Sequence, residues 1–191
     1  MNKKFLALFL LFLVGTAQSS MAQFYPQSYS RHIEINIPAK TLRLIQGNTI
    51  LREYPISVGK SKEWMTPIGN FNVIEKTKNP LWINPIKGTK IGPGKNNPLG
   101  TRWIGFYKNA KGQAFGIHGT NDPSSIGKFI SHGCVRMKPR DIEEVYDFVG
   151  IGTSVNIVYN RVVYKQNPYG EQVIVNVHPD PYGLQPIDED E

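Results

Sequence analysis

The sequence has no apolar run long enough to span a membrane, which takes roughly twenty residues. Its longest such run, residues 5–14, covers about ten residues and follows Lys3 and Lys4. Small and polar residues then lead up to Ala22, which completes the layout of a secretory signal peptide over residues 1–22. We therefore expect an exported domain in the periplasm or cell-wall space, with no stable membrane insertion. Retention of the run as a membrane anchor is the alternative.

The sequence also lacks a second cysteine, since Cys134 is the only one in the chain. Small exported domains often depend on disulfides, and a single cysteine cannot form one within the chain. Such a cysteine is either an inert buried residue or a reactive thiol, and its neighbours must distinguish the two.

Blocks of like charge are absent except at the acidic end of the chain, residues 188–191. The formal net charge of +7 is carried by scattered basic residues. A basic surface favours anionic partners, which include nucleic acids and cell-wall polymers. The sequence has no nucleic-acid motif and export argues against such a partner, so we expect a cell-wall polymer and no nucleic acid.

Alternating apolar and polar residues predict a mostly β protein. Ile33, Ile35 and Ile37, for example, alternate with polar side chains. Closely spaced prolines and glycines predict a long irregular loop between residues 79 and 100. Strands are predicted at residues 33–37, 41–45, 49–58, 71–75, 103–107, 114–118 and 154–159, followed by a hairpin over 161–177 that turns at 167–170.

One helix is predicted, from Pro139 to Val149. Proline suits the first helical position, acidic residues follow it, and Gly150 is placed to end the helix. The expected fold is therefore a β-sandwich or flattened barrel with one packed α-helix and a small C-terminal β-hairpin. We expect the main domain at residues 23–160, the hairpin extension at 161–180, and an acidic, disordered tail at 181–191.

Side chains that could take part in catalysis are concentrated in one stretch, where His118, His132 and Cys134 fall within seventeen positions. Only the thiolate of a cysteine attacks a carbonyl carbon, and its reference pKa of about 8.5 keeps most of it protonated at neutral pH. A nearby imidazole can remove that proton. Gly133 allows a sharp turn before the cysteine, and the N–H groups of Gly133 and Cys134 would then face a developing oxyanion.

These residues belong to a composite pattern that resembles the L,D-transpeptidase (YkuD-like) family. Its central parts are Ile117-His118-Gly119-Thr120 and Ser131-His132-Gly133-Cys134-Val135-Arg136, with further matching stretches at residues 56–60, 66–71 and 97–100. The likeness extends from about Ile33 to Tyr159, and the hairpin after it resembles an extension found in some members.

The resemblance implies a cysteine acyltransferase that acts on peptidoglycan stem peptides without a cofactor. Cys134 would attack the bond between the third and fourth stem residues, and His118 would be the general base. An amine of a second stem peptide, or of a wall-anchored protein, would then resolve the thioester. The residues implied to shape the oxyanion site or support the substrate are Ser131, His132, Gly133, Gly119 and Arg136.

One position departs from the family pattern, because some members have serine where this chain has Gly119. If a hydroxyl group orients the imidazole in those members, a backbone carbonyl or Thr120 must do so here.

The residues leave other interpretations open. Water in place of the amine would make the protein an L,D-carboxypeptidase, and a member without catalysis would be a cell-wall-binding module. Two histidines and a cysteine would also suit a catalytic zinc ion, although we expect no metal. Arg136 fits a structural salt bridge as well as a substrate contact. We interpret the tryptophans as packing residues in preference to a substrate platform; they are Trp64, Trp82 and Trp103.

Overall fold

The structure is a computed structural model that describes residues 30–84, 87–166 and 173–185. The predicted signal peptide (residues 1–22), the hairpin turn (167–170) and the last residues of the chain (186–191) lie outside these ranges. Within the described ranges, no helix is both long and apolar enough to cross a membrane.

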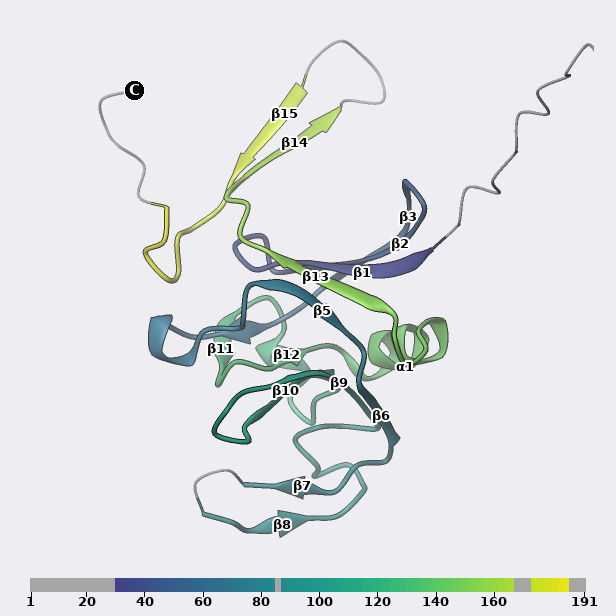
Figure 1. Cartoon of the computed structure of the whole chain (residues 1–191). Coiled ribbons are helices and arrows are strands. Elements are labelled where there is room, and N and C mark those ends of the chain that lie inside the picture. Colours follow the sequence, from purple (N-terminus) through teal and green to yellow (C-terminus); the bar gives the residue numbers. More distant parts are fainter. Residues whose placement is uncertain (1–29, 85–86, 167–172, 186–191) are drawn as a thin grey trace, which may run out of the picture.

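Two open sheets form the body of the molecule (Figure 1). The first has the strand order β3-β2-β1-β13-β5 and the second the order β12-β10-β9-β6. The first sheet consists of β1 (Arg31–Asn36), β2 (Thr41–Gln46), β3 (Thr49–Pro55), β5 (Gly69–Asn72) and β13 (Ser154–Val158). The second consists of β6 (Glu75–Lys78), β9 (Arg102–Lys108), β10 (Ala114–His118) and β12 (Val135–Arg136).

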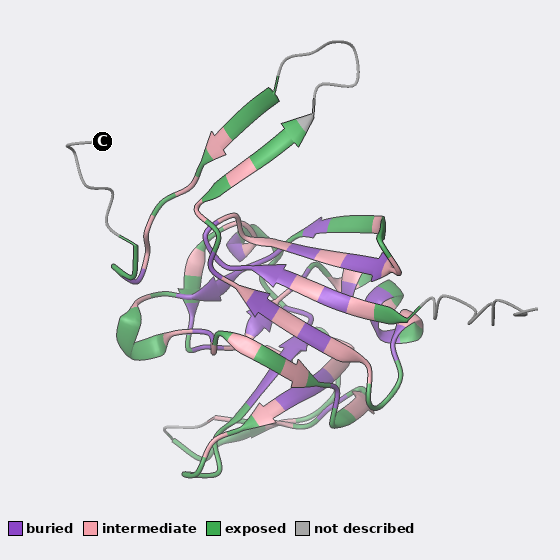
Figure 2. Cartoon of the chain, turned by 45° about the horizontal axis from the view of Figure 1, so that its top comes forward, coloured by how far each residue is buried: buried purple, intermediate pink, exposed green. Residues whose placement is uncertain are grey.

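Three pairs of strands lie outside these sheets. They are β4 (Val58–Gly59) with β11 (Phe129–Ser131), β7 (Trp82–Ile83) with β8 (Lys90–Ile91), and β14 (Val162–Gln166) with β15 (Val173–Val177). Two short 3-10 helices, Lys62–Trp64 and Pro123–Ser125, lie in the loops. The β14–β15 hairpin projects from the body in Figure 1, and most of its described side chains are exposed in Figure 2.

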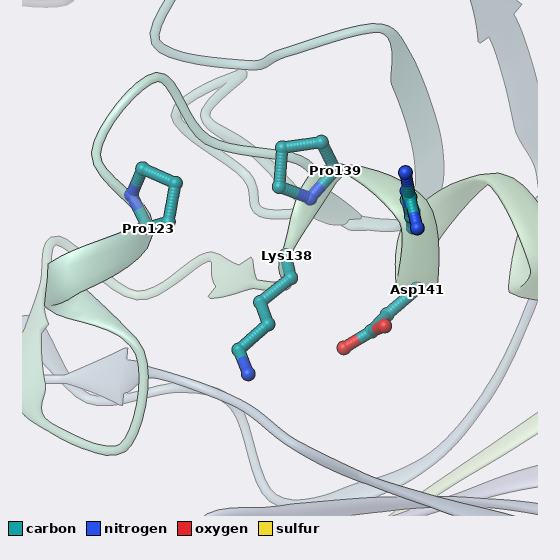
Figure 3. Close-up of a pocket in the computed structure, with 5 residues that line it drawn as sticks. Pro123, Lys138, Pro139 and Asp141 are labelled. Atoms are coloured by element: carbon teal, nitrogen blue, oxygen red, sulfur yellow. The ribbon is translucent and has the colours of Figure 1, made fainter.

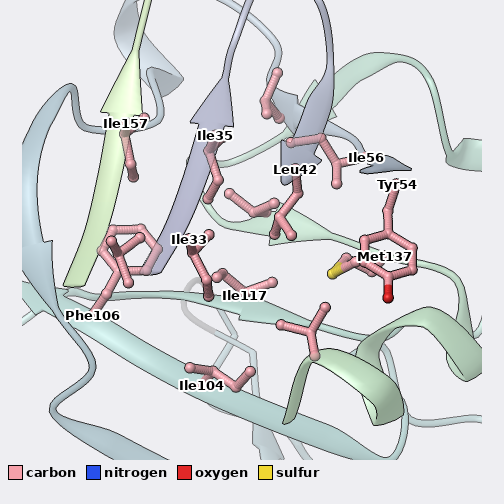
Figure 4. Close-up of a cluster of buried hydrophobic side chains, with 14 of the residues drawn as sticks. Ile33, Ile35, Leu42, Tyr54, Ile56, Ile104, Phe106, Ile117, Met137 and Ile157 are labelled. Atoms are coloured by element: carbon pink, nitrogen blue, oxygen red, sulfur yellow. The ribbon is translucent and has the colours of Figure 1, made fainter. Parts of the chain in front are cut away.

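The core lies between the two large sheets. Ile33 and Ile35 of β1, Ile104 of β9 and Ile117 of β10 are fully buried and point into one apolar cluster (Figure 4). Because successive side chains of a strand face opposite sides, the alternating isoleucines of β1 place one face of the first sheet on this cluster. The prediction of a mostly β protein is confirmed, and the described strands form a sandwich of open sheets.

Two predicted strands are wrong in the same way. The predicted strand at 49–58 is divided into β3 and β4, and the one at 71–75 into β5 and β6. In each case the chain leaves the first sheet and pairs elsewhere. Ile56 and Val73 at the crossings are fully or almost fully buried. The apolar pattern therefore continues through the crossing, and the change of pairing partner leaves no mark in the sequence.

The predicted helix is present as α1, Pro139–Phe148, with proline in its first turn. Its buried residues are Ile142, Val145 and Tyr146. The helix ends because Val149 adopts an extended conformation, so the assignment of its end to Gly150 is wrong. The N–H of Gly150 instead donates to Thr153 Oγ1 at 3.0 Å. Lys76 on β6 donates to the carbonyl oxygen of Val149 at 2.5 Å and ties the helix end to the second sheet.

The long loop between residues 79 and 100 carries the small β7–β8 pair and is held at its end by Asn97. The Asn97 side chain is fully buried and donates to the carbonyl oxygens of Pro80 (2.7 Å) and Gly92 (3.1 Å). Its Oδ1 accepts the N–H of Leu99 at 2.8 Å. A buried amide satisfied on both sides fixes the return of this loop toward the second sheet.

The prediction of a disordered tail at residues 181–191 is wrong for its first part. Tyr182 is only 3% exposed, and its ring stacks on Tyr159 with 5.5 Å between ring centroids. The backbone N–H of Tyr182 donates to the Tyr159 hydroxyl at 3.0 Å. A single aromatic side chain anchors this segment, although its average composition is that of a solvated tail.

Candidate active site

His118 is the last residue of β10 and is 5% exposed. Its Nδ1 lies 2.6 Å from the carbonyl oxygen of Gly119. A carbonyl oxygen only accepts hydrogen bonds, so Nδ1 carries the hydrogen and Nε2 keeps a lone pair. The hydroxyl of Thr120, the other candidate for this role, is bound to the backbone of Asp122. The Gly119 carbonyl therefore orients the imidazole.

The pairing of β10 with β12 brings the turn that carries Cys134 next to β10. The two strands are parallel, with Ile117 opposite Val135 and His118 opposite Arg136. Alternate residues of a strand share a face, so the side chains of Arg136 and His118 lie on the face opposite to the core residue Ile117. Cys134 precedes β12 in the adjoining turn. The Sγ atom of Cys134 lies 3.9 Å from the carbonyl oxygen of Ala114 on β10.

The turn before Cys134 is built around Ser131. Its hydroxyl donates to the carbonyl oxygen of Cys134 at 2.5 Å and accepts the N–H of Gly133 at 3.1 Å. Gly133 has a φ of +110°, and a Cβ atom there would lie 2.7 Å from the Phe115 ring, so only glycine fits. The expected pair of oxyanion donors is reduced, because the Gly133 N–H is engaged inside the turn. Cys134 N–H is the remaining donor of that pair.

Burial shifts the pKa values of His118 and Cys134 so that each favours its neutral form. It lowers the pKa of His118 to about 4, to which the positive charge of Arg136 also contributes, against the opposing effect of the Gly119 hydrogen bond. Burial also raises the pKa of the Cys134 thiol, an effect partly offset by the N–H of Gly116 and by Arg136. At neutral pH the candidate site therefore holds a neutral imidazole and a protonated thiol.

His132 lies in different surroundings from His118. It is exposed on the turn, and its ring meets the Trp64 ring edge-on, with 4.5 Å between centroids and 87° between planes. Partial desolvation lowers the pKa of His132, with smaller contributions from the charges of Lys60 and Arg136. The residue forms part of the rim beside Cys134.

Trp103 on β9, which we interpreted from the sequence as a packing residue, packs against the imidazole of His118. It faces His118 across the strand pair, and the two rings stack with 6.0 Å between centroids. A Cβ atom at Gly116 would lie 2.7 Å from the indole, and one at Gly105 would lie 3.1 Å from its Nε1. The glycines thus make room for the indole beside His118. These two glycines are cross-strand partners, a register that the sequence alone does not show.

Arg136 has a backbone role and a charge role. Its N–H and carbonyl oxygen both pair with Ser57, at 2.8 and 2.9 Å, and this links β12 to the segment before β4. Its guanidinium contributes to the lowered pKa values of His118 and His132. A positive charge on this face is also suited to a carboxylate of the substrate.

The described residues contain no group of three or more histidine, cysteine or carboxylate side chains that could hold a metal ion. The zinc interpretation therefore gains no support from their arrangement. A hollow at the start of α1, lined by Pro123, Lys138, Pro139, Arg140 and Asp141, contains none of the predicted site residues (Figure 3).

A family model for the YkuD L,D-transpeptidase catalytic domain matches residues 30–157. The chain belongs to the L,D-transpeptidase family. It is 39% identical over 132 residues to the L,D-transpeptidase YkuD of Bacillus subtilis, covering 69% of this chain and 68% of that protein. It is 37% identical over 127 residues to YqjB of the same organism, covering 66% and 70%. Against ErfK/SrfK of Escherichia coli the identity is 28%, and the match spans about half of that longer protein (49%).

Solved structures confirm the fold of the family. The catalytic domain of an L,D-transpeptidase from Enterococcus faecium superposes with a TM-score of 0.54 at 23% identity, covering 68% of this chain and 98% of that domain. An L,D-transpeptidase from Stackebrandtia nassauensis gives 0.52 at 18% identity, covering 75% and 62%. The protein is an L,D-transpeptidase by family, and peptidoglycan stem peptides are the substrate class of such enzymes.

Proposed function

We propose that Cys134 is the nucleophile and His118 the general base of L,D-transpeptidation. The observation that carries this assignment is the hydrogen bond from His118 Nδ1 to the Gly119 carbonyl oxygen. It leaves the lone pair of Nε2 free. A neutral imidazole can accept a proton at the moment of attack, whereas a protonated one cannot.

The reaction then follows in two halves. Cys134 Sγ attacks the carbonyl carbon of the third stem residue while its proton moves to His118 Nε2, and the N–H of Cys134 stabilises the oxyanion. The bond to the fourth residue breaks, and His118 returns the proton to the leaving amino group of D-alanine. In the second half an acceptor amine attacks the thioester carbonyl, its proton passes to His118, and the thiol of Cys134 is regenerated.

The acceptor in this proposal is the amine of a second stem peptide, which gives a crosslink. An amine of a wall-anchored protein would use the same thioester. Arg136 is assigned to a carboxylate of the substrate, because its charge lies on the same face as His118. Ser131, His132, Gly133 and Gly119 are assigned to shaping the turn, its rim and the orientation of the base.

The experiment is incubation of the protein with purified muropeptides that carry tetrapeptide stems, followed by mass spectrometry. The proposal predicts crosslinked dimers and free D-alanine, and neither product from a folded Cys134→Ser variant. Tripeptide monomers without dimers would show that water, and not an amine, resolves the thioester, and the enzyme would then be an L,D-carboxypeptidase. Intact tetrapeptides after incubation with folded protein would contradict the proposal.

We also infer that the protein acts outside the cytoplasm. The support is the arrangement of Lys3, Lys4, the apolar run and Ala22 in residues 1–22. The mature protein is expected to begin near Gln23, which terminal sequencing of protein from cells will test. An abundant species that retains Met1 would point to a membrane anchor instead.

A further inference from the structure

The segment after the β14–β15 hairpin returns to the body and contacts a loop beside the candidate site. This loop, Gly59–Thr66, is called the rim loop here because it carries Trp64 against His132. The returning residue is Tyr182, whose hydroxyl donates to the carbonyl oxygen of Gly59 at 3.0 Å and accepts the N–H of Thr66 at 3.3 Å. One buried hydroxyl thus joins the two ends of the rim loop.

The base of the rim loop is tightly closed. The N–H of Gly59 donates to Thr66 Oγ1 at 3.0 Å, and a Cβ atom at Gly59 would lie 2.0 Å from the Trp64 carbonyl oxygen and 2.8 Å from the Tyr182 hydroxyl. The hydroxyl therefore occupies space that only a glycine leaves free. Removing it would leave two buried backbone groups, Gly59 C=O and Thr66 N–H, without this partner.

The rim loop is also joined to the turn that carries Cys134. Strand β4 pairs with β11, and the N–H of Lys60 donates to the Ser131 carbonyl oxygen at 3.1 Å. The carbonyl oxygen of Met65 lies 3.2 Å from the position of a Cβ atom at Gly133. The position of the rim loop therefore bears directly on the shape of the turn.

Tyr182 is itself held in place by Tyr159 and Asp180. The Tyr159 hydroxyl accepts the N–H of Tyr182 and donates to the carboxylate of Asp180. That carboxylate also accepts the N–H groups of Leu184 (3.0 Å) and Gln185 (2.9 Å). This network fixes the segment from Asp180 to Gln185, which lies beyond the end of the family match at residue 157.

We infer that Tyr182 is a positioning residue for acyl transfer, which it supports by holding the rim loop against the turn of Cys134. The C-terminal segment beyond the family domain is then part of the support of the active site. This inference rests on the proposed function of Cys134, but its test includes a measurement that does not depend on activity.

The test compares Tyr182→Phe, which removes only the hydroxyl, with the matched variant Tyr164→Phe on the projecting hairpin, where Tyr164 is 69% exposed. Acylation of Cys134 by a tetrapeptide muropeptide should slow about tenfold in Tyr182→Phe, because the hydrogen bonds that hold the two ends of the rim loop are lost. It should be unchanged in Tyr164→Phe. The second readout is the NMR resonance of the His132 ring, whose ring-current shift from Trp64 should decrease only in Tyr182→Phe.

A lowered unfolding temperature of Tyr182→Phe with unchanged acylation and an unchanged His132 resonance would overturn the inference, because the role would be structural alone. If the wild-type protein is not acylated, the proposed function fails, and with it the role of Tyr182 in acyl transfer; the His132 resonance then tests separately whether Tyr182 holds the rim loop against the turn. If Tyr182→Phe does not fold, Tyr159→Phe keeps the hydroxyl of Tyr182 but loosens its support. It should then show the same changes to a smaller extent, and no change in either readout would overturn the inference.

Discussion

The two histidine environments beside Cys134 differ in almost every physical respect. His118 is buried at the end of β10, its tautomer is set by the Gly119 carbonyl, and Trp103 covers its ring. His132 is exposed on the turn and contacts the edge of Trp64. Burial lowers the pKa of both, and it lowers that of the more deeply buried His118 to about 4.

This difference indicates which histidine is suited to act as a base and which protonation state it has before the reaction. A buried imidazole with one nitrogen already bound presents a single, neutral acceptor, whereas an exposed ring on a turn has no such constraint. We therefore infer that a neutral His118 deprotonates a protonated Cys134 during attack, with no preformed thiolate–imidazolium pair.

Both histidines are proposed to support the reaction of the Cys134 thiol. Removal of that thiol should therefore lower the rate of acyl transfer more than any other change. Cys134→Ala is expected to lower acyl transfer by about a thousandfold or more, because no other side chain can form the thioester. Loss of D-alanine release, measured by mass spectrometry with a circular dichroism spectrum of the folded variant as control, checks this. Retained release would remove the basis of the comparison.

Replacing the buried histidine should have the next largest effect. His118→Gln keeps a hydrogen-bond donor for the Gly119 carbonyl but has no basic nitrogen, so acylation should slow about a hundredfold. Single-turnover acylation at pH 7 measures this. If His118→Gln leaves the acylation rate nearly unchanged, the burial and tautomer of His118 do not identify the base.

The burial of His118 should also appear as a pH dependence of stability. Its pKa is about 4 in the folded protein and 6.5 in the unfolded chain, so the unfolded chain binds more protons between these values. The stability due to neutral His118 is present above pH 6.5 and is lost as the pH falls toward 4. Between pH 7 and pH 5 the wild type should lose about 2 kcal/mol more unfolding free energy than His118→Gln. If urea titrations show that the wild type and His118→Gln lose the same unfolding free energy, His118 lies in a solvated environment.

The smallest effect is expected at the exposed histidine. His132→Ala should slow acylation by about fivefold or less, because the oxyanion donor of the turn is a backbone N–H and not this ring. The same single-turnover assay ranks the two histidines directly. An effect larger than that of His118→Gln would reverse the assignment of the base while leaving Cys134 as the nucleophile.

The sequence was sufficient for the parts of the site that depend on local pattern. Strand β10 and helix α1 follow from periodicity and from Pro139, and Gly133 follows from the need for a sharp turn before Cys134. The choice between the Gly119 carbonyl and Thr120 could not be made, because it depends on side-chain rotation. The engagement of Gly133 N–H by Ser131 is likewise a product of the folded turn.

The remaining misses concern contacts between distant segments. Trp103 reaches the site through strand pairing, and Tyr182 reaches the rim loop after the whole hairpin has been formed. Neither is marked by periodicity, and the acidic composition around Tyr182 pointed to disorder. Local sequence patterns therefore do not identify residues whose role depends on a contact with a distant segment of the chain.

The pH dependence of alkylation at Cys134, the only cysteine in the chain, distinguishes a neutral pair from a preformed thiolate–imidazolium pair. Iodoacetamide reacts with the thiolate, so its rate constant follows the fraction of thiolate. For a neutral pair we expect the rate constant to rise once, above the ordinary pKa of a cysteine, because burial raises the pKa of this thiol. We expect the same profile in His118→Gln. A fast plateau between about pH 5 and pH 8 that disappears in His118→Gln would demonstrate a preformed ion pair and contradict the account.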